Sequence, residues 1–204
     1  MVDNKLNFDE HIELKVKKAN QILGIIRRSF TSFSHNSFIK LYKALVRSHL
    51  EYGVSVWHPH KIKHIEMIES VQRRATRYLP GLKSLSYENR LKILNLPSLT
   101  YRRIRGDMII VYKLLNNYYN VDPSLLINLK TYSDVRLTGR NHILAIFHEF
   151  CNKDTRKYFF TNRVAHHWNN LPHHVIFSPS LNTFKNRLDD YWDKIPFKYD
   201  YKAI

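Results

Sequence analysis

Apolar residues that recur at helical spacing constrain this chain more than any other feature of its sequence. In residues 9–30 they are spaced 4-3-4-3-4, at Ile12, Val16, Ala19, Leu23, Ile26 and Phe30. This spacing predicts one amphipathic helix, with its apolar stripe packed on a core or on a partner helix. The whole chain of 204 residues has only five glycines and seven prolines, so it offers few tight turns. We therefore expect a mainly α fold.

Similar patterns and their flanking residues predict the remaining elements. Asn36 or Ser37 can cap a helix that runs towards Trp57 and ends by Pro59. Further helices are expected at 61–79 (closed by Pro80-Gly81), after Ser86 and ending before Pro97, at about 99–117 after Ser98, at 155–169, and after Ser180.

The domain organisation follows from where this periodicity weakens. We expect a helical bundle over 1–118, a connector over 119–154 and a smaller helical part over 155–204, whose last residues should fray. The connector holds a turn at 138–141 and at most one short strand or hairpin, at 143–147.

Positive charge is concentrated in one stretch of the chain. The formal net charge is +16, from 33 Lys and Arg against 17 Asp and Glu. Residues 61–105 hold eleven Lys and Arg and three Glu, whereas residues 106–150 hold four of each sign. Such a concentration suits a nucleic-acid groove or an anionic membrane surface.

Two arginine clusters lie within this stretch. In the helix 61–79, the apolar stripe Ile65, Ile68, Val71, Ala75 and Leu79 leaves Lys63, Arg73, Arg74 and Arg77 together on the opposite side. That side can bind phosphates, or it can be a solvated helix surface. Arg102, Arg103 and Arg105 either extend the same path or hold neighbouring loops through carbonyls and acidic partners. Tyr52 and Trp57 could stack on bases, or they could anchor the core.

Motifs of catalysis and metal binding are missing from the sequence. There is no phosphate-cradling glycine loop, no Gly-x-Ser-x-Gly and no His-Glu-x-x-His, and the adjacent acidic pair Asp189-Asp190 suits a solvated surface. We expect no catalytic residue, no metal and no cofactor. With Cys151 as the single cysteine, no signal peptide and no apolar run of membrane length, we expect an intracellular protein of the nucleus or cytoplasm, neither secreted nor membrane-spanning.

The order of several short motifs resembles a known family. The motifs are 41–53 followed by Val56-Trp57, Val71-Gln72-Arg73-Arg74-Ala75-Thr76, Leu96-Pro97-Ser98-Leu99, Arg102-Arg103-x-Arg105-Gly106-Asp107, Phe159-Phe160-x-Asn162-Arg163-Val164, Trp168-Asn169-x-Leu171-Pro172 and Ser180-Leu181-Asn182-x-Phe184-Lys185. Together with 2–12, they resemble the thumb and post-thumb region of jockey-like, LINE-type non-LTR retrotransposon reverse transcriptases. The resemblance spans essentially the whole chain.

This resemblance implies a nucleic-acid-binding role without catalysis. Polymerases of the family carry palm aspartates that hold magnesium, and their elements also encode an endonuclease; neither is found in this sequence. The chain resembles a truncated remnant of an RNA-directed DNA polymerase. Its expected partners are an RNA or DNA template-primer duplex and, in a full-length parent, the palm domain upstream. The alternative is a structural or protein-interaction module whose cations bind an acidic partner.

Overall fold

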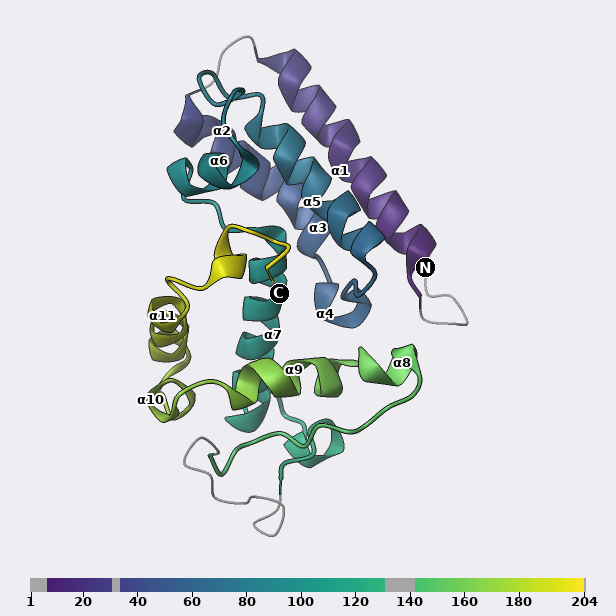
Figure 1. Ribbon diagram of the computed structural model, residues 1–204, viewed down its shortest axis with the longest axis vertical. Helices are drawn as coiled ribbons and strands as arrows, with labels where there is room; N and C mark the ends of the chain where they lie inside the picture. Colours follow the sequence, from purple (N-terminus) through teal and green to yellow (C-terminus); the bar gives the residue numbers. More distant parts are fainter. Residues whose placement is uncertain (1–6, 31–33, 131–141, 204) are drawn as a thin grey trace. The chain divides into compact units, whose positions relative to one another are not determined.

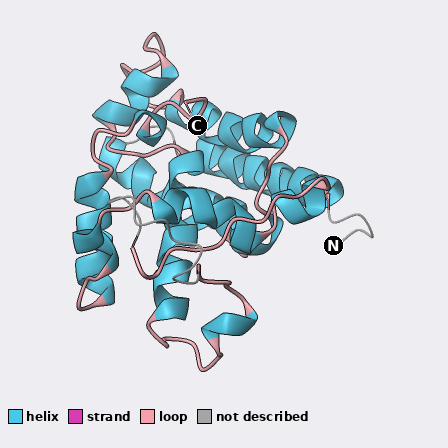
Figure 2. Cartoon of the chain, turned by 60° about the horizontal axis from the view of Figure 1, so that its bottom comes forward, coloured by secondary structure: helices cyan, strands magenta, loops and turns pink. Residues whose placement is uncertain are grey.

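The computed structural model describes residues 7–30, 34–130 and 142–203. It is mainly helical, which confirms the expected fold class (Figures 1 and 2). No strand occurs among these residues: the strand predicted at 143–147 is reduced to one antiparallel bridge, between Leu129 and Ile146. The turn predicted at 138–141 lies outside the described ranges.

The chain divides into two compact units. Unit 1 comprises 1–103 with 196–204, and unit 2 comprises 104–195. This division differs from the domain boundaries expected from the sequence, because the long helix α7 (Leu99–Leu115) begins in unit 1 and continues into unit 2. The segment expected to be a connector buries Ile127, Ala145 and Ile146, so it contributes to a core rather than only joining two others.

Unit 1 is built from short and long helices around one apolar cluster. Besides the start of α7 its helices are α1 (Asp9–Ser29), α2 (His35–Leu41), the π-helix η1 (Tyr42–Arg47), α3 (Ser48–Glu51), α4 (Val54–Trp57), α5 (Ile62–Thr76), α6 (Tyr87–Ile93) and the 3-10 turn η3 (Pro196–Lys198). The predicted stripes of α1 and α5 are buried in this cluster, except that Ile65 is half-buried and Phe30, after the end of α1, is exposed.

The helix expected between Asn36 or Ser37 and Trp57 is interrupted. Ser34 is its N-cap, since its side chain accepts a hydrogen bond from the Ser37 amide (3.1 Å). After α3 the backbone turns at Gly53, whose φ of 66° is a left-handed conformation that glycine adopts without strain. The sequence predicted one continuous helix here and not this break.

Helices α1 and α5 lie side by side and run parallel (Figure 1). Contacts between them occur in the same order along both helices: Asp9 meets Lys61, Glu13 meets Lys63, and Asn20 meets Arg74. The two C-terminal ends therefore lie at the same end of the helix pair.

Unit 2 has its own core. Its helices, besides the rest of α7, are η2 (Pro123–Leu125), α8 (Asp154–Lys157), α9 (Phe160–Asn169), α10 (His173–Ile176) and α11 (Leu181–Tyr191). The predicted helix 155–169 is thus two helices. Trp168 is fully buried, and Phe184 stacks on Tyr112, with their ring centroids 4.4 Å apart.

A buried carboxylate ties α5 to the start of α7. Glu69 is fully buried; it accepts hydrogen bonds from the Tyr87 hydroxyl (2.6 Å) and from the Leu99 amide (3.1 Å to Oε2). Leu99 is the first residue of α7, so Glu69 satisfies one of the amides that a helix start leaves unpaired. Burial raises the pKa of the Glu69 carboxyl, while the nearby Arg103 cation opposes this rise.

The C-terminal segment is packed, so the expectation that it frays is wrong. Phe197 and Tyr201 are buried. The Ser98 amide and hydroxyl donate to the Lys198 and Phe197 carbonyls (both 2.8 Å), and the Arg73 guanidinium donates to the Tyr201 hydroxyl. These contacts explain why 196–204 belongs to unit 1.

Removal of the buried carboxylate should destabilise unit 1. In Glu69→Ala, the Tyr87 hydroxyl and the Leu99 amide lose their acceptor inside the core, and we expect the free energy of unfolding to fall by about 3 kcal/mol. Urea denaturation measures the loss. Glu66→Ala, on the exposed side of the same helix, is the matched control and should change stability by less than about 0.5 kcal/mol.

The pH dependence gives this prediction a second readout. Because the pKa of Glu69 is higher in the folded state than its ordinary value of 4.5, the folded chain binds this proton more tightly than the unfolded chain. The contribution of that proton to the free energy of unfolding is fully present below the ordinary pKa. It is lost as pH rises through the folded-state pKa. The difference between wild type and Glu69→Ala should thus be larger at about pH 5 than at about pH 8; an equal difference contradicts this view of Glu69.

Candidate nucleic-acid interface

The first arginine cluster is only partly available at the surface of unit 1. Arg74 and Arg77 are exposed. Arg74 donates to the Asn20 side chain (3.0 Å). The backbone amide of Arg77 donates to the Arg74 carbonyl (3.1 Å), but its guanidinium makes no hydrogen bond or ion pair with any residue the structure describes. Lys63 is 70% exposed and lies 3.6 Å from a Glu13 oxygen, which is a weak pairing in water. These three cations are positioned to meet a solvent-borne anion.

Arg73 has a different environment from its neighbours. Its guanidinium lies over the rings of Tyr87 (5.4 Å to the centroid) and Tyr201 (5.3 Å), in addition to its hydrogen bond with the Tyr201 hydroxyl. Arginine stacks on aromatic faces in this way, and each such contact is stabilising. Arg73 therefore holds the C-terminal segment on α5, and its expected place on an open basic side is wrong.

The second arginine cluster does not form a basic surface. Arg102 makes a bidentate pair with Glu51, and Arg105 makes another with Asp189 (Nη2–Oδ2 2.7 Å). Arg103 is 2% exposed and donates to the Thr100 hydroxyl (2.8 Å). Of the two alternatives open from the sequence, the structure supports the second one: Arg102 joins α7 to α3 and Arg105 joins α7 to α11, while Arg103 is buried within unit 1.

The two aromatic candidates for stacking on bases lie in different environments. Trp57 is 4% exposed, and its indole N–H donates to the Tyr52 carbonyl (2.9 Å), so it is a core residue and the stacking role is wrong for it. Tyr52 is 79% exposed, with the Lys15 ammonium 5.5 Å from its ring centroid. On α1, Lys15 lies on the other flank of the buried stripe from the residues that touch α5. Tyr52 thus stays available, but away from α5.

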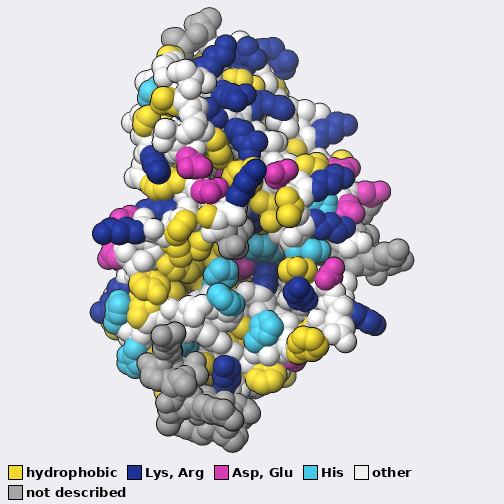
Figure 3. Space-filling view, in the orientation of Figure 1, with side chains coloured by type: hydrophobic (Ala, Val, Ile, Leu, Met, Phe, Trp, Pro, Cys, Tyr) yellow, Lys and Arg dark blue, Asp and Glu magenta, His cyan; other side chains and the backbone are white. Residues whose placement is uncertain are grey.

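Helix α1 adds cations that sequence reasoning did not assign to the site. Lys17, Arg27 and Arg28 are exposed, and Arg27 lies over the ring of Tyr78, just beyond α5 (4.9 Å). We define the α1–α5 basic face as Lys17, Arg27, Arg28, Lys63, Arg74 and Arg77. In Figure 3, lysine and arginine side chains gather over the helices that Figure 1 labels α1 and α5. The sequence signalled that α1 is amphipathic, but nothing in it showed which helix lies beside α1.

Acidic residues are scarce on this face. In α1 they stop at Glu13, and after Glu69 no acidic residue occurs before Glu88. Glu66, on the exposed side of α5, has the Lys202 ammonium 3.8 Å away. Unit 1 carries 21 Lys and Arg against 9 Asp and Glu, whereas unit 2 carries 12 against 8, so most of the excess charge belongs to the unit with this face.

The described ranges contain neither a metal-binding cluster nor a membrane-spanning helix. There, no three His, Cys, Asp or Glu side chains gather so as to hold a metal ion. His64, one of the histidines near Pro59, is buried and lies 3.2 Å from an Asp9 oxygen. None of the described helices is long and apolar enough to cross a membrane.

Comparison with known proteins gives a relative without an assigned function. No protein-family model matches the chain, and no solved structure does. Over 137 residues the chain is 30% identical to the uncharacterized protein B0403.1 of Caenorhabditis elegans, a match that covers 65% of this chain and 69% of the nematode protein. The chain belongs to the same family as this nematode protein. The resemblance to reverse transcriptases stays a hypothesis.

Arg73, in the last turn of α5, and Arg77, the residue that follows this helix, should respond differently to truncation. We expect Arg73→Ala to lower the free energy of unfolding by about 1–2 kcal/mol, because two ring contacts and a hydrogen bond disappear. Hydrogen exchange should quicken at Tyr201 and its neighbours. Arg77→Ala, which removes the same charge without a described partner, should leave both readouts unchanged; a loss of stability as large as for Arg73→Ala would contradict the assignment.

Proposed function

We propose that the chain binds RNA or DNA duplexes, without sequence preference, through the α1–α5 basic face. The observation that carries the proposal is the run of exposed cations on two parallel helices. A cationic surface of this kind binds phosphates because each neutralised phosphate releases condensed counterions. Contacts to the backbone read no base, so the binding tolerates any sequence.

The spacing of the cations supports a duplex as the ligand. Lys17 and Arg28 are eleven residues apart on α1, and Lys63 and Arg74 are eleven residues apart on α5. Eleven residues make about three helical turns and span roughly 16 Å, so each pair lies on one side of its helix. Two parallel rows of this length suit a polyanion with regularly repeated charges better than a single phosphate group.

We infer that this binding descends from the thumb of a non-LTR retrotransposon reverse transcriptase, and that the chain does not polymerise by itself. The motif order supports the ancestry. Fewer arginines are available to bind phosphates than the resemblance implied. Arg73, Arg102, Arg103 and Arg105 are engaged within the protein.

Salt dependence tests the binding role directly. We expect Arg74→Ala/Arg77→Ala to weaken duplex binding and to reduce the slope of log affinity against log salt by about 1.8, since each lost phosphate contact removes about 0.9. Fluorescence anisotropy at several salt concentrations measures both quantities.

The control removes the same charge elsewhere. Lys185→Ala/Lys194→Ala, in and just after α11 of unit 2, should leave the slope unchanged. If both double variants change the slope equally, binding follows net charge and the face has no special role. Tighter binding to an acidic protein than to duplexes at equal salt would favour the alternative function, in which the chain is a protein-interaction module whose cations bind an acidic partner.

A primer-extension assay tests the second part of the proposal. With magnesium, deoxynucleotides and an annealed template-primer, we expect no extension product from the chain alone, because the sequence lacks the palm aspartates of the resembled family. An active reverse transcriptase assayed in parallel shows that the substrate is competent. Product that persists after repeated purification would refute a non-catalytic role.

A further inference from the structure

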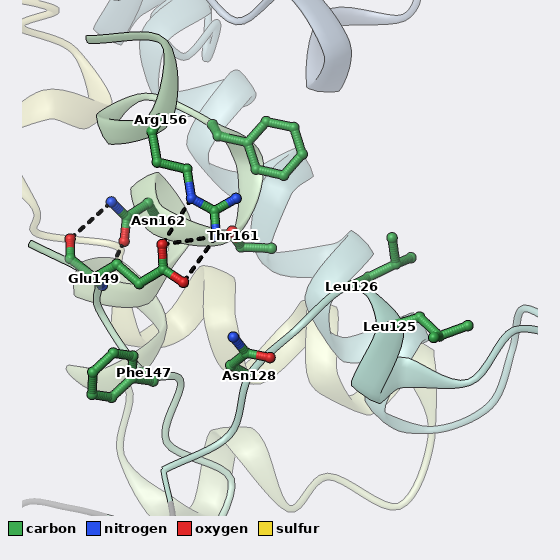
Figure 4. Close-up of a pocket in the computed structure, with 9 residues that line it drawn as sticks. Leu125, Leu126, Asn128, Phe147, Glu149, Arg156, Thr161 and Asn162 are labelled. Atoms are coloured by element: carbon green, nitrogen blue, oxygen red, sulfur yellow. Dashed lines mark hydrogen bonds and ion pairs between the residues drawn. The ribbon is translucent and has the colours of Figure 1, made fainter. Parts of the chain in front are cut away.

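Unit 2 contains a small pocket that the basic face does not explain. Its volume is about 160 Å³, and it is lined by Leu125, Leu126, Asn128, Phe147, Glu149, Arg156, Phe159, Thr161 and Asn162 (Figure 4). Pockets for drug-sized ligands span roughly 300–1,000 Å³, so this one suits a single ring system.

The polar side of the pocket is held in a fixed arrangement. Arg156 donates to both oxygens of Glu149 (2.8 Å each). Asn162, 4% exposed, binds both backbone groups of Glu149: its Oδ1 accepts from the amide (2.9 Å), and its Nδ2 donates to the carbonyl (3.1 Å). Because Arg156 and Glu149 neutralise each other, the pocket offers no net charge to an ionic ligand.

The other side of the pocket is apolar and open to solvent. Leu125 is 77% exposed, while Leu126, Phe147 and Phe159 are each a little under half exposed. The Arg156 guanidinium lies 5.7 Å from the centroid of the Phe159 ring. Exposed apolar side chains that converge on a pocket indicate a binding site rather than incidental surface.

Two polar groups in the pocket are available to a ligand. The side-chain amide of Asn128 and the hydroxyl of Thr161 make no hydrogen bond with any residue in the described ranges. An amide can donate and accept at once, so it matches the edge of a heterocycle that presents both kinds of group. The preferred occupant is therefore small, neutral and flat, with an apolar face and a hydrogen-bonding edge.

We propose that this pocket binds one unpaired nucleobase, stacked against its aromatic side chains, with its edge on Asn128 and Thr161. Proteins that bind single strands use such aromatic platforms, because every base has a π face. The proposal rests on the proposed function, since it adds a base site to a chain that binds nucleic acid.

Nucleosides test the pocket without the phosphates that the basic face requires. Adenosine, guanosine, cytidine and uridine are each titrated into the full chain, and backbone amide resonances are followed by NMR. We expect shifts confined to the pocket residues, which disappear in Asn128→Ala. If N-acetyltyrosinamide shifts these resonances and no nucleoside does, the pocket takes a peptide side chain and the proposal fails. If no probe shifts them, it fails too.

A single-stranded RNA provides the matched comparison. Phe147→Ala should weaken RNA binding roughly 5- to 150-fold, as for loss of one stacked base, with an unchanged salt slope. Phe150→Ala removes an aromatic ring that is 93% exposed and outside the pocket, and it should change nothing. Equal effects of the two variants overturn the proposal. If instead the proposed role of the basic face is wrong, Arg74→Ala/Arg77→Ala will leave the slope of log affinity against log salt unchanged. The two failures are therefore distinguishable.

Discussion

The parallel packing of α1 on α5 is the constraint on which the basic face depends. It brings together two C-terminal ends, whose carbonyl dipoles are both negative, and Arg27, Arg28 and Arg74 lie near those ends. Part of this charge serves to balance the dipoles. That effect fades within one turn, however, and it cannot account for Lys17 in the middle of α1 or for Lys63 at the start of α5, where a cation is unfavourable. The polyanionic partner that we propose would explain why both positions carry a cation.

The same helix carries the buried carboxylate and the exposed cations. Glu69 points into the core, where it receives the Leu99 amide, and the opposite side of α5 presents Arg74 and Arg77. Rotation of α5 that hid the cations would leave the start of α7 without its acceptor, which is costly inside a core. The orientation of the basic face is therefore determined by the interior of unit 1 and not by its surface charges, which repel one another.

Sequence patterns predicted what is local. The stripes of α1 and α5 were correct apart from Phe30 and Ile65, because helix period involves residues a few positions apart. Ser86, Ser98 and Ser180 start helices as expected, whereas Ser34 takes the place of the expected cap Asn36 or Ser37. The roles of the arginines could not be predicted in the same way. Glu51 lies 51 residues from Arg102, Asp189 lies 84 residues from Arg105, and Tyr201 lies 128 residues from Arg73. A cluster in the sequence does not reveal which members find such partners.

The two proposed sites use chemistries that complement each other. Under our proposal, binding of a polyanion by the α1–α5 basic face should weaken as salt rises, because its free energy would come from counterion release. The pocket of unit 2 is neutral, since Arg156 and Glu149 cancel, so salt should leave it largely unaffected. Its polar side is held by Asn162 before any ligand arrives, so a base that enters does not have to order that side. A chain with both sites would still bind an unpaired base at salt concentrations that weaken its contacts to the phosphate backbone.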